Sequence, residues 1–180
     1  MCLGSYQASV LTPPEVVVVP GAEAFVANNH FVPGFNARLN ARISGVSKNF
    51  NDWFLSGIGK IEEPILRSAL GYQTLQLDSK DESIMEKLGG YQNAETRLSQ
   101  IFHLITLQPN GGKGALLIED GKGGQIGNIF YVRDMDDVRR VVFVSWCRGG
   151  WLIAAVPACS SRQSLHRGHR VFSRYNPAIQ

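Results

Sequence analysis

The last part of the chain is a series of short extended segments separated by turn residues at close intervals. Segments rich in β-branched and aromatic residues alternate there with turns rich in Gly and Asp. The expected strands cover residues 115–119, 127–133, 139–147, 151–156 and 170–175. Because the connections are too short for the helical crossovers that parallel strands require, neighbouring segments are expected to pair antiparallel. The sequence therefore predicts a C-terminal antiparallel β-meander of four or five strands within residues 111–176.

Residues 1–21 contain the run Glu15–Val19, in which four valines follow a glutamate and prolines stand on both sides. β-Branched residues favour extended structure, and prolines end it. An N-terminal arm or an edge strand is expected here.

Residues 22–110 are expected to be mixed and rich in helix. Ser47 can cap a short helix over residues 48–56, and Ser79 stands at capping-box spacing before another. The clearest helical periodicity predicts a main helix over residues 94–108.

These elements predict an α+β fold with an N-terminal arm, a helical middle and a C-terminal antiparallel meander. The length of 180 residues and the hydrophobic fraction of 44% are those of one folded domain that spans residues 1–180.

Charge is distributed unevenly along the chain. Residues 138–180 carry seven arginines and no Lys, Asp or Glu, which gives this segment +7. The whole chain is +3, so residues 1–137 carry −4. A guanidinium group presents a planar set of donors that fits phosphate or carboxylate, and it also stacks on flat rings. The basic segment is therefore expected to bind an anionic partner.

The expected binding residues are the arginines of this segment and three aromatic residues near them. The arginines, as phosphate contacts, are Arg139, Arg140, Arg148, Arg162, Arg167, Arg170 and Arg174. The aromatic residues, as stacking platforms for bases, are Trp146, Trp151 and Tyr175. A cross-strand pair that stabilises a hairpin is the alternative interpretation of the two tryptophans. The leading functional hypothesis is non-enzymatic binding of nucleic acid, with RNA slightly preferred over DNA, or of another polyanion.

Two histidines in the same segment suggest a second function. His166 and His169 flank Arg167 and Gly168, and one imidazole as general base with another as general acid can cleave RNA without a metal. A small metal-independent ribonuclease or phosphodiesterase is therefore an alternative. Against it, neighbouring arginines lower the pKa of a histidine and weaken it as an acid.

No metal or cofactor is expected. Cys147 and Cys159 are far apart in the sequence, unlike the close ligand pairs of structural zinc sites. The acidic clusters at residues 62–63, 78–82 and 134–137 stand at turns and helix starts, where carboxylates bind backbone amides, and they are interpreted as structural. Such clusters could also pair with the basic segment of another copy. A protein-interaction or self-assembly module, with an acidic protein or a second copy as partner, is the third hypothesis.

An odd number of cysteines, three, with no repeated spacing favours a reducing, cytoplasmic setting. The N-terminal apolar run at residues 16–19 is far shorter than the ~20 residues of a membrane span, so no membrane partner is expected.

Overall fold

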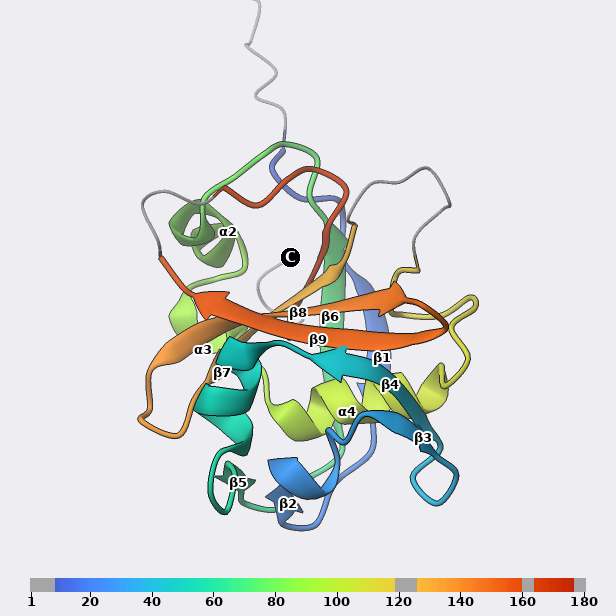
Figure 1. The fold of residues 1–180 in the computed structure, drawn as a ribbon. Helices are drawn as coiled ribbons and strands as arrows, with labels where there is room; N and C mark the ends of the chain where they lie inside the picture. Colours follow the sequence, from blue (N-terminus) through green and yellow to red (C-terminus); the bar gives the residue numbers. More distant parts are fainter. Residues whose placement is uncertain (1–8, 119–125, 160–163, 177–180) are drawn as a thin grey trace, which may run out of the picture.

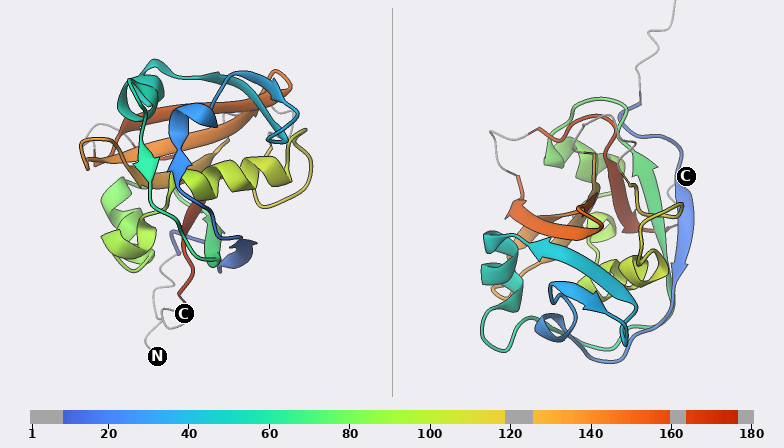
Figure 2. Two further views of the ribbon diagram at one scale, coloured as in Figure 1. Left: turned by 90° about the horizontal axis from the view of Figure 1, so that it is seen from below. Right: turned by 45° about the vertical axis from the view of Figure 1, so that its right-hand side comes forward.

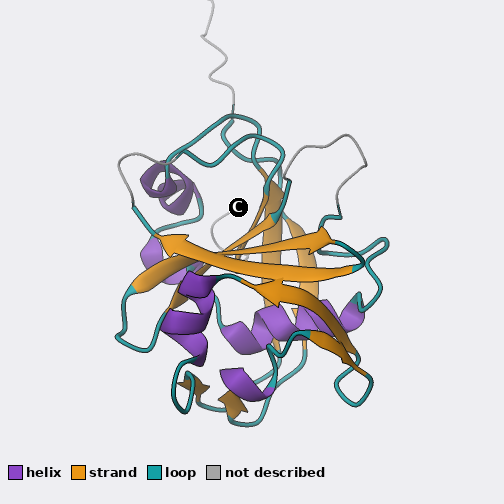
Figure 3. Ribbon diagram, viewed as in Figure 1, coloured by secondary structure: helices purple, strands orange, loops and turns teal. Residues whose placement is uncertain are grey.

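The computed structural model describes residues 9–118, 126–159 and 164–176. Within these residues the centre of the fold is an eight-stranded sheet with the order β1-β6-β10-β7-β8-β9-β4-β3 (Figures 1 and 3). In chain order its strands are β1 (Glu15–Val19), β3 (Gly34–Asn36), β4 (Ala41–Val46), β6 (Ser68–Thr74), β7 (Asn128–Arg133), β8 (Arg139–Cys147), β9 (Gly150–Pro157) and β10 (Arg170–Arg174). The short strands β2 (Phe25–Val26) and β5 (Ile61–Glu62) form a separate antiparallel pair.

The predicted architecture, a helical middle followed by a meander of four or five strands, is wrong. The sheet is mixed, because β10 is parallel to β7 and β4 is parallel to β9. The N-terminal half of the chain supplies β1, β3, β4 and β6. Of the expected meander only β7, β8 and β9 pair consecutively and antiparallel. A strand is expected at residues 115–119, but residues 115–118, which the structure describes, form no strand.

Strand β6 is the element that the sequence pattern does not reveal. It contains Gly71 and few β-branched residues, yet it pairs antiparallel with β1 on one side and with β10 on the other. Pairing with two neighbours, rather than local propensity, therefore makes this segment a strand. β10 does not continue the meander, because it pairs with β6 on one side and with β7 on the other.

Both faces of the sheet are covered by apolar side chains. One face carries Leu70, Phe130, Val142, Ile153 and Phe172, which pack with residues of the N-terminal half and of helix α4 (Leu98–Leu107). The other face carries Ile129, Tyr131, Val141 and Val171, which pack with helices α2 (Asp81–Lys87) and α3 (Tyr91–Ala94). Figure 2 shows α4 and the α2–α3 pair as separate groups beside the strands. The sheet thus lies between two apolar cores.

The helix expected over residues 48–56 is present almost in full, whereas the main helix is shorter than expected. Ser47 caps α1 (Lys48–Phe50) by accepting the Phe50 N–H, as predicted, and a π-helical turn over Asn51–Leu55 continues it. Ser79 does not cap α2, because its backbone pairs with Leu165 and Lys80 takes the cap position. None of the described helices is long and apolar enough to cross a membrane.

Three non-helical residues, 95–97, separate α3 from α4 within the predicted main helix. Thr96 donates its N–H and its hydroxyl to the carbonyl of Tyr131, which fixes the chain against β7. Helix α4 begins only at Leu98, where the buried carboxylate of Glu62 accepts the N–H groups of Leu98 and Ser99 and the Ser99 hydroxyl. A negative charge at this end of a helix is stabilised by the aligned backbone dipoles.

The structural interpretation of the acidic clusters is confirmed where side-chain contacts are seen. Besides Glu62, the carboxylate of Asp134 accepts the N–H groups of Asp136 and Val138 in the turn between β7 and β8.

Replacing Glu62 with Ala should destabilise the protein by about 2–3 kcal/mol, because three buried donors lose their acceptor. The matched control is Glu63→Ala, whose exposed side chain should contribute no more than about 0.5 kcal/mol. Urea unfolding followed by circular dichroism measures both variants. Equal effects of the two substitutions would contradict the capping role.

Candidate anion-binding site

Arg139 and Arg140, adjacent on β8, are engaged inside the protein. Arg139 Nη2 lies 3.4 Å from Glu95 Oε2, and Arg140 Nε donates to Asp134 Oδ2 at 2.6 Å. The guanidinium group of Arg140 also lies 3.9 Å from the ring centroid of Trp53. Both arginine side chains are largely buried, so these cations stabilise the sheet from within.

Arg170 is also used internally. Its Nη1 donates to the carbonyl of Ala115 at 2.5 Å, and its guanidinium lies 4.6 Å from the ring centroid of Tyr72. Removal from water lowers the pKa of this guanidinium. Arg170 therefore holds the segment after α4 against the sheet.

Arg148 and Arg167 are exposed and lie toward the same end of the sheet. Arg148 is in the β8–β9 hairpin, and Arg167 precedes β10. The register pairs Arg170 with Asn128 and Asn128 with Val144, which places both loops beyond this end. Arg162 lies outside the described residues. The six described arginines do not gather on one surface, since three are internal and Arg174 ends β10 at the opposite end.

The two tryptophans form the cross-strand pair. Trp146 and Trp151 are register partners on β8 and β9, with ring centroids 5.1 Å apart at 76°. Trp151 is fully buried and donates its indole N–H to the carbonyl of Gln108. The alternative interpretation is confirmed for Trp151, which has no face open to a base, whereas Trp146 stays half-buried beside Gly111.

The two histidines have different surroundings. His166 is exposed, and its Nδ1 lies 3.2 Å from Asp78 Oδ2. His169 is buried, and its Nδ1 accepts the N–H of Gly127 at 3.0 Å. Burial lowers the pKa of His169. An acid–base pair that acts on one phosphate needs both imidazoles to reach the same solvent-facing point, and this arrangement does not favour it.

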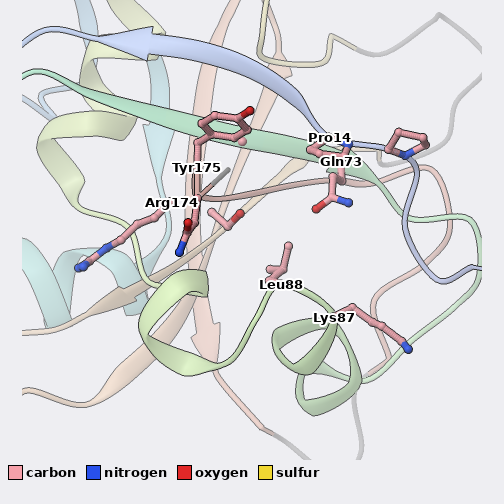
Figure 4. A pocket seen from close by; sticks show the side chains of 10 residues that line it. Pro14, Gln73, Lys87, Leu88, Arg174 and Tyr175 are labelled. Carbon is pink, nitrogen blue, oxygen red and sulfur yellow. The ribbon is translucent and has the colours of Figure 1, made fainter. Parts of the chain in front are cut away.

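A cavity of about 370 Å³ lies on the α2 side of the sheet, against β6 and β10. Its walls are residues of the N-terminal segment, of β6, of α2 and of the end of β10: Pro13, Pro14, Gly71, Gln73, Lys87, Leu88, Ser173, Arg174, Tyr175 and Asn176. Figure 4 shows Lys87 and Arg174 at opposite margins of the cavity with their charged ends directed outward, Tyr175 and Gln73 beside β6, and Leu88 below them. Two cationic side chains thus flank a polar and aromatic wall.

A second cavity, of about 330 Å³, is formed where β6 begins and α4 starts. Its walls are Ile65, Leu66, Ser68, Ala69, Arg97, Gln100, Arg174 and Tyr175. Arg174 and Tyr175 belong to both cavities, which we call the paired cavities. The volumes fall in the range of small-molecule sites.

The described residues that line the paired cavities include three with cationic side chains, Lys87, Arg97 and Arg174, and none with an acidic side chain. Glu95 lies three residues before α4. Its Oε2 is 2.9 Å from Arg133 Nε and also pairs with Arg139 Nη2. Its backbone carbonyl accepts from Arg174 Nε, which orients that guanidinium. Among the described lining residues of the paired cavities, formal positive charge is thus in excess, with the buried carboxylate of Glu62 close by at the start of α4.

Of the predicted binding residues, the structure places Arg174 and Tyr175 in the paired cavities. Sequence reasoning missed Lys87, Arg97, Gln73 and Ser173, since they come together only through the position of β6 beside β10. No spacing along the chain indicates that neighbourhood. Among the described residues, no three His, Cys, Asp or Glu side chains are grouped as metal ligands.

No profile of a known protein family, no curated protein and no solved structure matches this chain. The function is therefore argued from the site alone.

The buried His169 predicts a dependence of stability on pH. The pKa of His169 in the folded state lies below the ordinary 6.5, so the unfolded chain binds a proton at this residue more readily than the folded chain does. Stability from this group is present above pH 6.5 and is lost as pH falls through the folded-state pKa. Unfolding free energies measured at pH 7.5 and pH 5.5 should differ less in His169→Asn than in the parent protein. An unchanged difference would show that His169 is not buried in its neutral form.

Proposed function

We propose that the protein binds single-stranded nucleic acid, RNA in preference to DNA, at the paired cavities and catalyses no reaction on it. The observation that carries the proposal is that both cavities share Arg174 and Tyr175 and that their described lining residues include cations and no acidic residue. Electropositive grooves with an aromatic side chain are typical of single-strand binding, in which phosphates meet cations and bases stack on rings.

An extended polyanion fits the site better than a single small anion does. The cations come from three separate elements, α2, the start of α4 and the end of β10, and so follow the two cavities rather than converge on one point. A strand that passes Tyr175 would meet Lys87 on one side and Arg97 on the other. Successive phosphates can therefore be neutralised by different residues.

The preference for RNA rests on the polar side chains of the larger cavity. Gln73, Ser173 and Asn176 line it next to the cations. A 2′-hydroxyl can donate and accept hydrogen bonds, so such groups distinguish ribose from deoxyribose. The proposal includes a reducing, cytoplasmic setting, which the cysteine content favours.

The test is fluorescence anisotropy with labelled oligouridine and oligothymidine over a series of salt concentrations. Each neutralised phosphate should contribute about −0.7 to the slope of log affinity against log salt. Arg174→Gln should weaken binding about 5- to 100-fold, as expected for one charge-assisted hydrogen bond, and should flatten the slope by about 0.7.

The matched control is Arg167→Gln, which removes the same charge at the opposite end of β10 and should leave both affinity and slope nearly unchanged. Thermal unfolding of each variant shows whether the fold is retained. Affinity that does not depend on salt, or equal losses in the two variants, would refute the paired cavities as the binding site. Cleavage of the oligouridine would favour the ribonuclease hypothesis instead.

A further inference from the structure

Strand β1 is one of the two edges of the large sheet. It pairs with β6 from Glu15 opposite Tyr72 to Val19 opposite Ser68, and no other described strand pairs with it. Figure 2 (right) shows β1 in blue along the outer margin of the molecule, beside β6 in green. One row of its backbone N–H and C=O groups therefore points away from the sheet.

This edge lacks several of the features that prevent edge strands from pairing, and its one charged residue, Glu15, is the first of the strand. It has no lysine, no internal proline and no break in its register with β6. The opposite edge, β3, has only three residues and begins at Gly34, whose φ of +119° departs from strand geometry. Of the two edges, β1 is the one suited to accept another strand.

The sequence around β1 is nearly symmetric about Val17. If two copies of β1 run antiparallel with Val17 opposite Val17, then Val16 lies opposite Val18, and Pro14 lies opposite Pro20. A shift of register would bring a proline into the ladder, where it cannot donate a hydrogen bond. The two prolines therefore limit self-pairing to one five-residue register.

We propose that β1 pairs with β1 of a second copy of this chain and joins the two sheets into one. Val17 and Val19 face the core, whereas Val16 and Val18 are 44% and 48% exposed on the other face. In the antiparallel arrangement these four exposed valines, two from each copy, pack across the two strands. The carboxylates of Glu15 lie at opposite ends of the ladder, while a parallel arrangement would place them side by side.

The two-fold axis of such a pair runs perpendicular to the sheet, so the α2 sides of both copies face the same direction. Pro13 and Pro14, which precede β1, line the larger of the paired cavities. The dimer therefore places two such cavities on one side of a continuous sheet. Because five residues form a small interface, the dimer should depend on protein concentration.

Analytical ultracentrifugation of the full chain over a concentration series tests the pairing. The parent protein should change from monomer to dimer, and the double variant Val16→Lys with Val18→Lys should stay monomeric, because both lysines face solvent in the folded monomer. The control is Val138→Lys, 45% exposed in the turn between β7 and β8, which should dimerise like the parent. A parent protein that is monomeric throughout, or a dimer that tolerates both lysines, would overturn the proposal.

The register is tested by oxidation of variants that each carry one added cysteine. A mixture of Val16→Cys and Val18→Cys should form a disulfide-linked heterodimer, since opposite residues in an antiparallel pair come within bonding distance. Val16→Cys alone should crosslink no more than the parent with its native cysteines. Equal crosslinking in the single variant and in the mixture would exclude this register.

Discussion

The cost of placing a guanidinium group in the interior without a partner determines which arginines remain for a ligand. A buried charge is tolerated only when it is paired and hydrogen-bonded. Arg140 meets this condition through Asp134 and Trp53, whereas Arg170 donates to backbone carbonyls and lies over the ring of Tyr72 while its buried Nε has no partner among the described residues. These arginines are part of the architecture. Part of the C-terminal positive charge thus makes contacts inside the protein, between the C-terminal strands and the other elements.

The position of β6 between β1 and β10 creates the candidate site. It sets the end of β10, with Arg174 and Tyr175, between α2 and the start of α4. Lys87 and Arg97 are far from Arg174 in the sequence and meet it only through this order of strands. The same order leaves β1 outermost. Anion binding and self-association, although proposed independently, both follow from one feature of the topology.

Local features were predictable where local physics decides them. The tight turns fix the β7–β8–β9 meander, and Ser47 caps α1. The strand character of β6 was not predictable, because its two neighbours impose it. The main helix is split because Thr96 is hydrogen-bonded to Tyr131 of β7 and because Glu62, a residue of the distant strand β5, accepts the first N–H groups of α4. For the site, the sequence identified Arg174 and Tyr175 but not the partners that distinguish them from Arg139 or Arg170.

The most direct test is to follow backbone amide chemical shifts by NMR while single-stranded oligouridine is added to the labelled protein. Binding at the paired cavities should shift the amides of Gly71, Gln73, Ser173 and Arg174 most strongly. It should leave Gly149 and Gly168, in the loops at the other end of the sheet, nearly unchanged. The largest changes at Gly149 and Gly168, or no saturable change anywhere, would contradict the paired cavities as the place where this protein meets a polyanion.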